Sequence, residues 1–263
     1  MFAVMVNEKD KILTLFTQER GLIGVYASGS RNVKSRLLAA ADLFCYADYV
    51  LSVKGDRYSV REAELIESFY GLRNDIVRIS FANYLCEVVR TVGTENLPDP
   101  PFLRLLLNTL YATASGKYEV PHIKAAFEVR AASLLGFCPD LSGCANCGKE
   151  DGEFFLEVLD GNMLCSDCRN VVQNDPAWRL EMEGHRTVLC ILTPAVLAAW
   201  RYCLSCPQER LLAFRLENEH DRMLFYRSAE EYLLNHLDRG FQSLTFYRMM
   251  LGQTEKETDE KGN

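Results

Sequence analysis

The fold of the N-terminal part is decided by residues 12–60, which open ILTLFTQERGLIGVYASGSRN (12–32) and close ADYVLSVKGDRYSV (47–60). The apolar runs are short, rich in Val, Ile, Tyr and Phe, and separated by Gly or Asp, as is typical of strands joined by turns. The closing segment predicts a hairpin with Gly55 and Asp56 in its turn. Several short strands here indicate a small barrel or sandwich, and the five-stranded OB type is a common oligonucleotide binder.

From about residue 61 the pattern changes from strands to helices. Apolar residues recur at spacings of three and four in REAELIESFYGL, SFANYLCEVVRTV, PPFLRLLLNTLYATAS and PHIKAAFEVRAASLLG. A further helix, TPAVLAAWRYCLSC, has Thr193 as a plausible N-cap and Pro194 at its first position. The closing residues 251–263 are mostly polar and charged, and predict a disordered tail.

The composition is that of an ordinary globular chain of one large or two smaller domains. Of 263 residues, 48% are hydrophobic and 25% charged, and no apolar run approaches the roughly 18 to 20 residues of a membrane span. The start, MFAVMVNEKDK, lacks the basic region and cleavage spacing of a signal peptide. We therefore expect a cytoplasmic protein without a membrane partner.

The net charge of −7 argues against a protein that binds DNA over its whole surface. The charge is unevenly spread, however. Residues 1–80 hold 11 Lys and Arg against 10 Asp and Glu, whereas the rest of the chain holds 18 against 26. If nucleic acid binds, the first segment is the better place to look.

Two Cys-x-x-Cys pairs predict a four-cysteine zinc site. The spacing C-x2-C-x17-C-x2-C is the one expected for such a site, and the four ligands are Cys144, Cys147, Cys165 and Cys168. Gly148 allows the chain to turn after the first pair, and a hairpin with Asp160 and Gly161 at its tip would return the second pair to the first. Four thiolates leave no open position on zinc, so the metal is expected to be structural, one per chain.

Other interpretations of these cysteines remain open. They could form two redox pairs or pack as plain thiols. The segment between the pairs, KEDGEFFLEVLDGN, is a poor ligand for phosphate because acidic side chains outnumber its single lysine.

The segment ASGSRNVKSRL (27–37) carries Arg31, Lys34 and Arg36 among small residues. Small residues let a backbone approach phosphates, hydroxyls and amides donate to them, and the cations attract them. A plain solvated basic loop explains the composition equally well. Three further cations would extend the patch if the barrel brings their turns together: Arg20, Lys54 and Arg57.

No enzyme signature occurs in the chain, whether a phosphate-binding loop, a dinucleotide fingerprint, a zinc-protease motif or a nucleophile elbow. We therefore expect no catalytic residues. A third Cys-x-x-Cys, Cys203 and Cys206, makes a thiol redox enzyme conceivable. Buried thiols at a helix end are the plainer interpretation.

The residues taken together resemble the bacterial DNA repair protein RecO family. The opening NEKDKILTLFTQERGLIGVYASGSRNVKSRL (7–37) is similar to the family's start, with its Asp-Lys segment, its Thr-x-x-x-Gly turn and its Gly-x-Arg-x-x-Lys-Ser-Arg loop. GFCPDLSGCANCG (136–148), LTPAVLAAWRYCL (192–204) and LNHLDRGFQSLTFY (234–247) resemble later family segments in the same order.

The resemblance implies an α+β protein: an N-terminal OB-fold β-barrel, then an all-helical domain with an inserted four-cysteine zinc module. The expected boundaries are 1–80, 81–250 with the module at 144–168, and the tail at 251–263. It also implies a recombination mediator. Such a protein binds single- and double-stranded DNA, anneals complementary strands coated by single-strand binding protein (SSB) and, with RecR, helps to load RecA.

A rival hypothesis is a zinc-stapled scaffold for protein interaction that never touches DNA. Under the resemblance, Arg31, Lys34 and Arg36 are the best candidate DNA contacts. Salt-dependent binding to an oligonucleotide would distinguish the recombination mediator from the protein interaction scaffold.

Overall fold

The computed structural model describes residues 2–5, 8–174 and 188–261, and the chain folds into two compact units. The first unit is residues 1–120 together with 241–263, and the second is residues 121–240. The sequence predicts a boundary at residue 80 instead. The difference arises because the helices that follow the sheet, and the C-terminal helix, pack into the first unit, and local sequence patterns carry no such long-range information.

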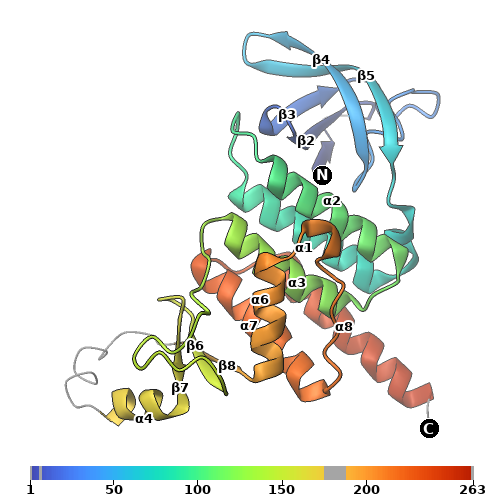
Figure 1. The fold of residues 1–263 in the computed structure, drawn as a ribbon. Helices are drawn as coiled ribbons and strands as arrows, with labels where there is room; N and C mark the ends of the chain where they lie inside the picture. Colours follow the sequence, from blue (N-terminus) through green and yellow to red (C-terminus); the bar gives the residue numbers. More distant parts are fainter. Residues whose placement is uncertain (1, 6–7, 175–187, 262–263) are drawn as a thin grey trace. The chain divides into compact units, whose positions relative to one another are not determined.

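The first unit contains a five-stranded sheet in the order β1-β2-β3-β5-β4 (Figure 1). All neighbouring strands are antiparallel except β3 and β5, where Val25 lies opposite Tyr58 in a parallel pair. The first strand is short but complete enough to pair with the second from Phe2 to Met5. The strands are β1 Phe2–Met5, β2 Lys11–Thr17, β3 Gly21–Ala27, β4 Tyr46–Lys54 and β5 Arg57–Glu67.

The inner face of this sheet is built by alternating apolar residues. Leu13, Leu15, Ile23 and Val25 are all buried and share one core cluster, as the period of two along a strand requires. The hairpin predicted at 54–57 is confirmed, since Lys54 pairs with Arg57 and Gly55 adopts a φ of 60°. A positive φ is what a two-residue hairpin turn demands, and glycine adopts it without steric cost.

The helix predicted from about residue 61 is wrong for residues 61–67, which continue β5. Arg, Glu, Ala and Leu favour helix in isolation, but only by a few tenths of a kcal/mol per residue. In the structure β5 pairs with β4 up to Glu67, and these backbone hydrogen bonds outweigh the local preference. Helical structure begins at the short 3-10 helix η1, Tyr70–Asn74.

Three helices complete the first unit: α1 Ile76–Val92, α2 Pro100–Ser115 and α8 Gln242–Lys261. Asp75 caps α1 by accepting hydrogen bonds from the backbone of Val77 and Arg78, which satisfies amides that lack an intrahelical partner. Glu87 on α1 accepts hydrogen bonds from the backbone and hydroxyl of Ser243. Residues far apart in the sequence thus join α1 to α8.

The disordered tail predicted at 251–263 is replaced by helix as far as Lys261. Low hydropathy favours disorder, but Glu, Lys and Gln are also good helix formers. Extending a helix that is already nucleated is far easier than starting one. The packed first turns of α8 therefore explain why its polar continuation is helical.

Gly21 occupies a position that tolerates only glycine. Its φ is +61°, and a Cβ atom there would lie 2.2 Å from the carbonyl oxygen of Leu97 and 2.6 Å from that of Thr94. We expect Gly21→Ala to destabilise the protein by about 3 kcal/mol and to lower its Tm by about 10 °C. Thermal unfolding followed by circular dichroism measures this. Gly24→Ala is the matched control because nothing lies within 4 Å of its Cβ position, and an equal loss there would contradict the assignment.

The second unit combines helices with a small three-stranded sheet in the order β7-β6-β8. Trp200 on one helix donates a buried hydrogen bond of 2.9 Å to Ser228 on another. Thr193 is the predicted N-cap, and its hydroxyl accepts from the backbone of Val196. The elements are α3 Val120–Leu134, β6 Phe154–Glu157, β7 Asn162–Cys165, α4 Ser166–Asn174, β8 Leu189–Leu192, α6 Pro194–Ser205, η2 Gln208–Arg210 and α7 Glu219–His236.

No helix in the described part of the chain is long and apolar enough to cross a membrane.

Candidate functional site

The four predicted metal ligands come together in the second unit. The sulfur atoms of Cys144, Cys147, Cys165 and Cys168 all lie within 4.8 Å of one another. The first pair lies in the loop after α3, Cys165 ends β7, and Cys168 is in the first turn of α4. Three of these thiols are buried and Cys147 is exposed.

Local backbone geometry explains how residues so far apart in sequence meet. Gly148 has a φ of +74°, and its amide donates to the carbonyl of Cys144 at 2.8 Å, which closes the tight turn around the first pair. The predicted hairpin is confirmed: Glu157 pairs with Asn162, and Gly161 in the turn has a φ of +65°. This hairpin returns Cys165 to the first pair.

The thiols differ in how readily they ionise. Burial disfavours the Cys144 thiolate, but backbone amides of Cys165, Cys147 and Asn146 outweigh it and lower the pKa of Cys144 to about 6. At Cys168 the Asn146 side chain favours the thiolate, but the other three thiols and burial outweigh it and raise the pKa to about 12. Four adjacent thiols cannot all ionise together unless a cation balances their charge.

The arrangement fits a tetrahedral metal site. A bond of about 2.3 Å from zinc to each sulfur places sulfur atoms about 3.8 Å apart, and the Cys147 and Cys165 sulfurs lie 3.8 Å apart. Cys144 also accepts a hydrogen bond from the Cys165 amide at 3.3 Å, as metal-bound thiolates commonly do. Four sulfur ligands would fill a tetrahedral shell and leave no position for substrate.

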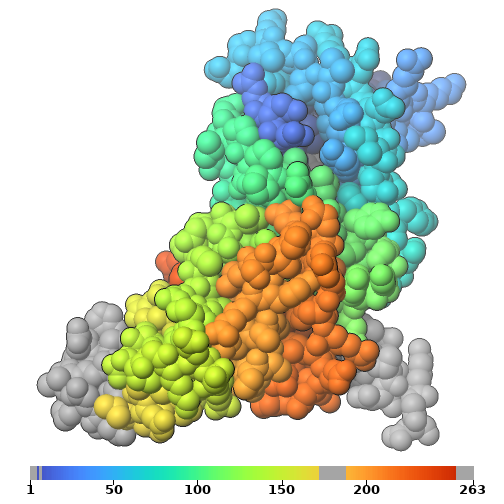
Figure 2. All heavy atoms as spheres, in the orientation of Figure 1, coloured from blue at the N-terminus to red at the C-terminus, as the bar shows by residue number. Residues whose placement is uncertain are grey.

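The second feature is the basic loop, residues 27–37, which leaves the end of β3. Arg31, Lys34 and Arg36 are all exposed along it. Figure 2 shows the blue segment that follows β3 projecting from the surface of its unit. A short series of turns gives the loop its shape: the Asn32 amide donates to Gly29 and the Ser35 amide to Asn32.

Asp10 holds the beginning of the basic loop. Its carboxylate accepts hydrogen bonds from the Gly29 amide at 2.7 Å, the Tyr26 hydroxyl at 2.5 Å and the Ser28 hydroxyl at 3.3 Å. The hydrogen bond to Asp10 is the main reason that the pKa of Tyr26 is raised, so the phenol keeps the proton that it donates. Next to Asp10, the carbonyl of Lys9 accepts from the Arg31 amide at 3.1 Å.

The chain that follows the basic loop is held as well. Lys11 donates to the carbonyl of Ala41 at 2.9 Å, and the Tyr49 hydroxyl donates to the carbonyl of Ala40 at 2.5 Å. Both ends of the cationic segment are therefore fixed to the sheet. Sequence reasoning singled out the cations and used Asp10 only as a family marker. An acidic residue just before a strand is too common to reveal an anchor.

We expect Asp10→Asn to loosen the basic loop without unfolding the sheet. The amide keeps one acceptor oxygen but loses the charge, and a charged hydrogen bond contributes about 1.5–3 kcal/mol. Amide exchange at Gly29 and Arg31 should then accelerate by at least about tenfold, as measured by hydrogen-exchange mass spectrometry or NMR. Glu8→Gln removes the same charge from an exposed neighbour and should leave these rates unchanged. Unchanged exchange in the Asp10 variant would show that the carboxylate is not the anchor.

The other predicted cations do not join the basic loop. Arg20 lies in the turn between β2 and β3, at the opposite end of β3 from the loop, which is roughly 20 Å away along the strand. Because β3 and β5 run parallel, the turn that carries Lys54 and Arg57 also points toward the beginning of β3. The fold therefore places these three cations on two turns that are separate from the basic loop, a consequence of strand order that spacing in the sequence does not reveal.

Cys203 and Cys206 lie where α6 ends, and both are buried free thiols. Arg130 donates to their carbonyl oxygens at 2.7 and 2.6 Å, so its charge stabilises the negative end of the helix. Burial raises the pKa of Cys203 well above its usual range. A neutral buried thiol is a poor nucleophile, so the geometry favours a structural role for this pair.

Two family models match consecutive parts of the chain. Residues 2–69 match the family model described as "Recombination protein O N terminal", and residues 73–182 match "Recombination protein O C terminal". The chain is 30% identical to the DNA repair protein RecO of Acetivibrio thermocellus over 250 residues, 94% of this chain and 93% of the relative. It is 31% identical to RecO of Desulforudis audaxviator over the same shares, and 29% identical to RecO of Alkaliphilus metalliredigens over 90% and 92%.

The chain therefore belongs to the RecO family, and the resemblance predicted from its motifs is confirmed.

Proposed function

We propose that this protein is a non-catalytic DNA repair and recombination mediator. It binds single- and double-stranded DNA, anneals complementary strands coated by SSB and, together with RecR, promotes loading of RecA. The observation that carries the proposal is the exposed basic loop, fixed to the sheet at both ends, in a chain of the RecO family. The names of the relatives, each a DNA repair protein, support the same role.

The sheet of the first unit is best interpreted as an OB-fold. It has five strands and a single parallel pairing, with the two strands at the ends of the order, β1 and β4, leaving a partly open barrel among the described residues. OB-folds bind oligonucleotides with one sheet face and the adjoining loops. The basic loop provides such a loop here.

Arg31, Lys34 and Arg36 are the proposed DNA contacts. Cations that meet phosphates release counterions, and this release supplies most of the non-specific affinity. The loop is a local concentration of positive charge on a chain whose net charge is −7. Such a chain depends on this local patch, and on protein partners, rather than on its overall charge.

The four-cysteine cluster is proposed to bind one zinc ion with a structural role. Zinc is the metal that four thiolates at tetrahedral spacing hold most often in proteins. It would staple the β6–β7 hairpin to the loop after α3 and to the first turn of α4. The acidic residues of the hairpin make this module an unsuitable phosphate contact.

The partners follow from the proposed role: DNA, SSB, RecR and, indirectly, RecA, all in the cytoplasm. The deciding test is annealing of complementary oligonucleotides that have been coated with SSB, followed by fluorescence with and without the protein. We expect the protein to accelerate duplex formation. No acceleration at any protein concentration, together with no salt-dependent binding to naked oligonucleotide, would support the zinc-stapled scaffold instead.

A further inference from the structure

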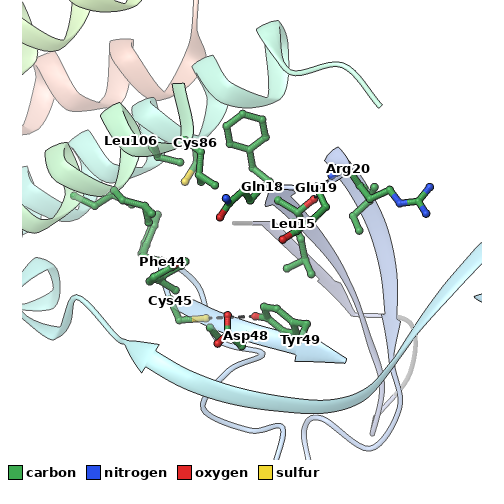
Figure 3. A pocket seen from close by; sticks show the side chains of 18 of the residues that line it. Leu15, Gln18, Glu19, Arg20, Phe44, Cys45, Asp48, Tyr49, Cys86 and Leu106 are labelled. Carbon is green, nitrogen blue, oxygen red and sulfur yellow. Dashed lines mark hydrogen bonds between the residues drawn. The ribbon is translucent and has the colours of Figure 1, made fainter. Parts of the chain in front are cut away.

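The first unit contains a pocket that the proposed DNA contacts do not use. Its volume is about 390 Å³, within the range of roughly 300–1,000 Å³ typical of ligand sites. One side is formed by β2, the β2–β3 turn and the beginning of β4, and the other by α1 and α2. Figure 3 shows side chains from these elements facing one another across the pocket.

The interior of the pocket is apolar. Leu15, Ile23, Phe44 and Leu106 line it and are each less than a tenth exposed. Burial also raises the pKa of the Cys86 thiol to about 11, so this wall is neutral at physiological pH. Protein interiors rarely leave voids larger than a water molecule, so apolar walls around a space of this size favour an apolar occupant.

The polar groups inside the pocket already have partners. Tyr49 donates to the carbonyl of Ala40, and the Cys45 thiol donates to the same carbonyl at 2.9 Å. These side chains are therefore satisfied by the protein and do not select a ligand. The specificity of the pocket for its ligand therefore depends on the exposed polar side chains at its mouth.

Four exposed polar side chains line the mouth: Gln18, Glu19, Arg20 and Asp48. In the part of the chain that the structure describes, none of these four side chains makes a hydrogen bond or ion pair. In Figure 3 the Arg20 guanidinium extends away from the other labelled side chains. Two carboxylates, at Glu19 and Asp48, thus stand at the mouth against one cation, and the net charge there is negative.

We propose that this pocket binds a partner polypeptide through one large apolar side chain, with a lysine or arginine of the same segment placed beside Glu19 and Asp48. The apolar side chain enters the space between sheet and helices. The basic residue meets the carboxylates at the mouth. Phosphate groups are disfavoured by the same carboxylates, so the site differs from the basic loop in both place and charge. The inference is independent of the proposed DNA contacts.

The test uses the full-length protein with ¹³C-labelled Ile and Leu methyl groups, because several of these line the pocket. The probes are two capped dipeptides, acetyl-Phe-Arg-amide and acetyl-Phe-Glu-amide, titrated into the protein and followed by NMR. We expect shifts at Leu15, Ile23 and Leu106, with the Arg probe binding about fivefold more tightly than the Glu probe. Oligothymidylate is titrated in parallel.

Variants separate the apolar and the charged parts of the site. Glu19→Gln with Asp48→Asn should remove the preference for the Arg probe while the apolar contact remains. Glu62→Gln with Glu64→Gln removes the same charge from exposed positions on β5 outside the pocket and should leave the preference intact. Leu107→Trp, at a half-buried lining position, should fill the space and abolish the shifts. Ala47→Leu serves the same purpose if the Trp variant misfolds.

Several results would overturn the proposal. They are an absence of pocket shifts with either peptide, equal affinity for the two peptides, and shifts that persist in a folded variant with a filled pocket. Pocket shifts caused by oligothymidylate but by neither peptide would make nucleic acid the ligand and would also overturn it.

Discussion

Serine in place of Cys165 is expected to abolish metal binding and to unfold the module that carries the four cysteines. Structural zinc contributes about 10–16 kcal/mol of apparent binding free energy in small modules, which is comparable to the whole stability of many domains. Three ligands that remain cannot close the shell. Phe154, Leu156 and Met163, which are fully buried in the hairpin, would become exposed to water. We expect the Tm to fall by at least about 10 °C.

Metal content and thermal unfolding, measured on the same preparation, check this result. Cys138→Ser is the matched control because Cys138 is an exposed thiol in the same segment but outside the cluster. A strong chelator should lower the Tm of the unmodified protein and leave the Cys165 variant unaffected. A metal-free variant with unchanged Tm would show that metal binding by the cysteines does not stabilise the second unit.

Replacing Arg31, Lys34 and Arg36 together with Gln is expected to cause the largest loss of DNA binding. Each cation that meets a phosphate of a single strand contributes about 0.7 to the slope of log affinity against log salt. Losing three contacts should therefore lower that slope by about 2 and weaken binding at least about tenfold at low salt. Fluorescence anisotropy with a labelled oligothymidylate at several salt concentrations measures both quantities.

The triple replacement Arg20→Gln, Lys54→Gln and Arg57→Gln is the positional control. It removes the same charge from the β2–β3 and β4–β5 turns, outside the basic loop, so its effect on affinity and slope should be much smaller. An equal effect of the two triple replacements would mean that the DNA contacts extend along the five-stranded sheet beyond the basic loop. Unchanged binding in the first triple would remove the basic loop from the DNA site.

The cysteine cluster and the basic loop are proposed to have different physical roles. Four thiolates bind a cation strongly but leave no open coordination position on it. The loop between the cysteine pairs is acidic. The basic loop carries no special chemistry, but it is exposed and held in position by Asp10, Lys11 and Tyr49. Damage to the module should therefore appear first as lost stability, and damage to the loop as lost affinity.

Much of this organisation could be predicted from local sequence. Short apolar runs rich in Val, Ile, Tyr and Phe predicted β2 and β3, and the Gly-containing turns at 55 and 161 predicted two hairpins. Thr193 and Pro194 predicted where a helix begins. In each case the interactions that form the element lie within a few residues of one another, so a short window of sequence contains the cause.

Predictions were wrong where the deciding partner is distant in the sequence. Residues 61–67 carry helix-favouring side chains, yet they form strand because β4 offers a paired edge. β8 was not predicted at all, since four residues acquire strand structure only beside β6. The first unit likewise includes α8, which contacts α1 more than 150 residues earlier.

By itself the sequence determined the four cysteines that come together, the cations of the basic loop and the family. These depend on residue type and spacing, which can be read directly from the sequence. Only the tertiary structure decided that Asp10 anchors the loop, that Arg20 lies away from it, and that an apolar pocket opens between sheet and helices. These properties arise from strand order and from packing between distant elements, because a side chain's neighbours in space are set by the fold and not by its neighbours in the chain.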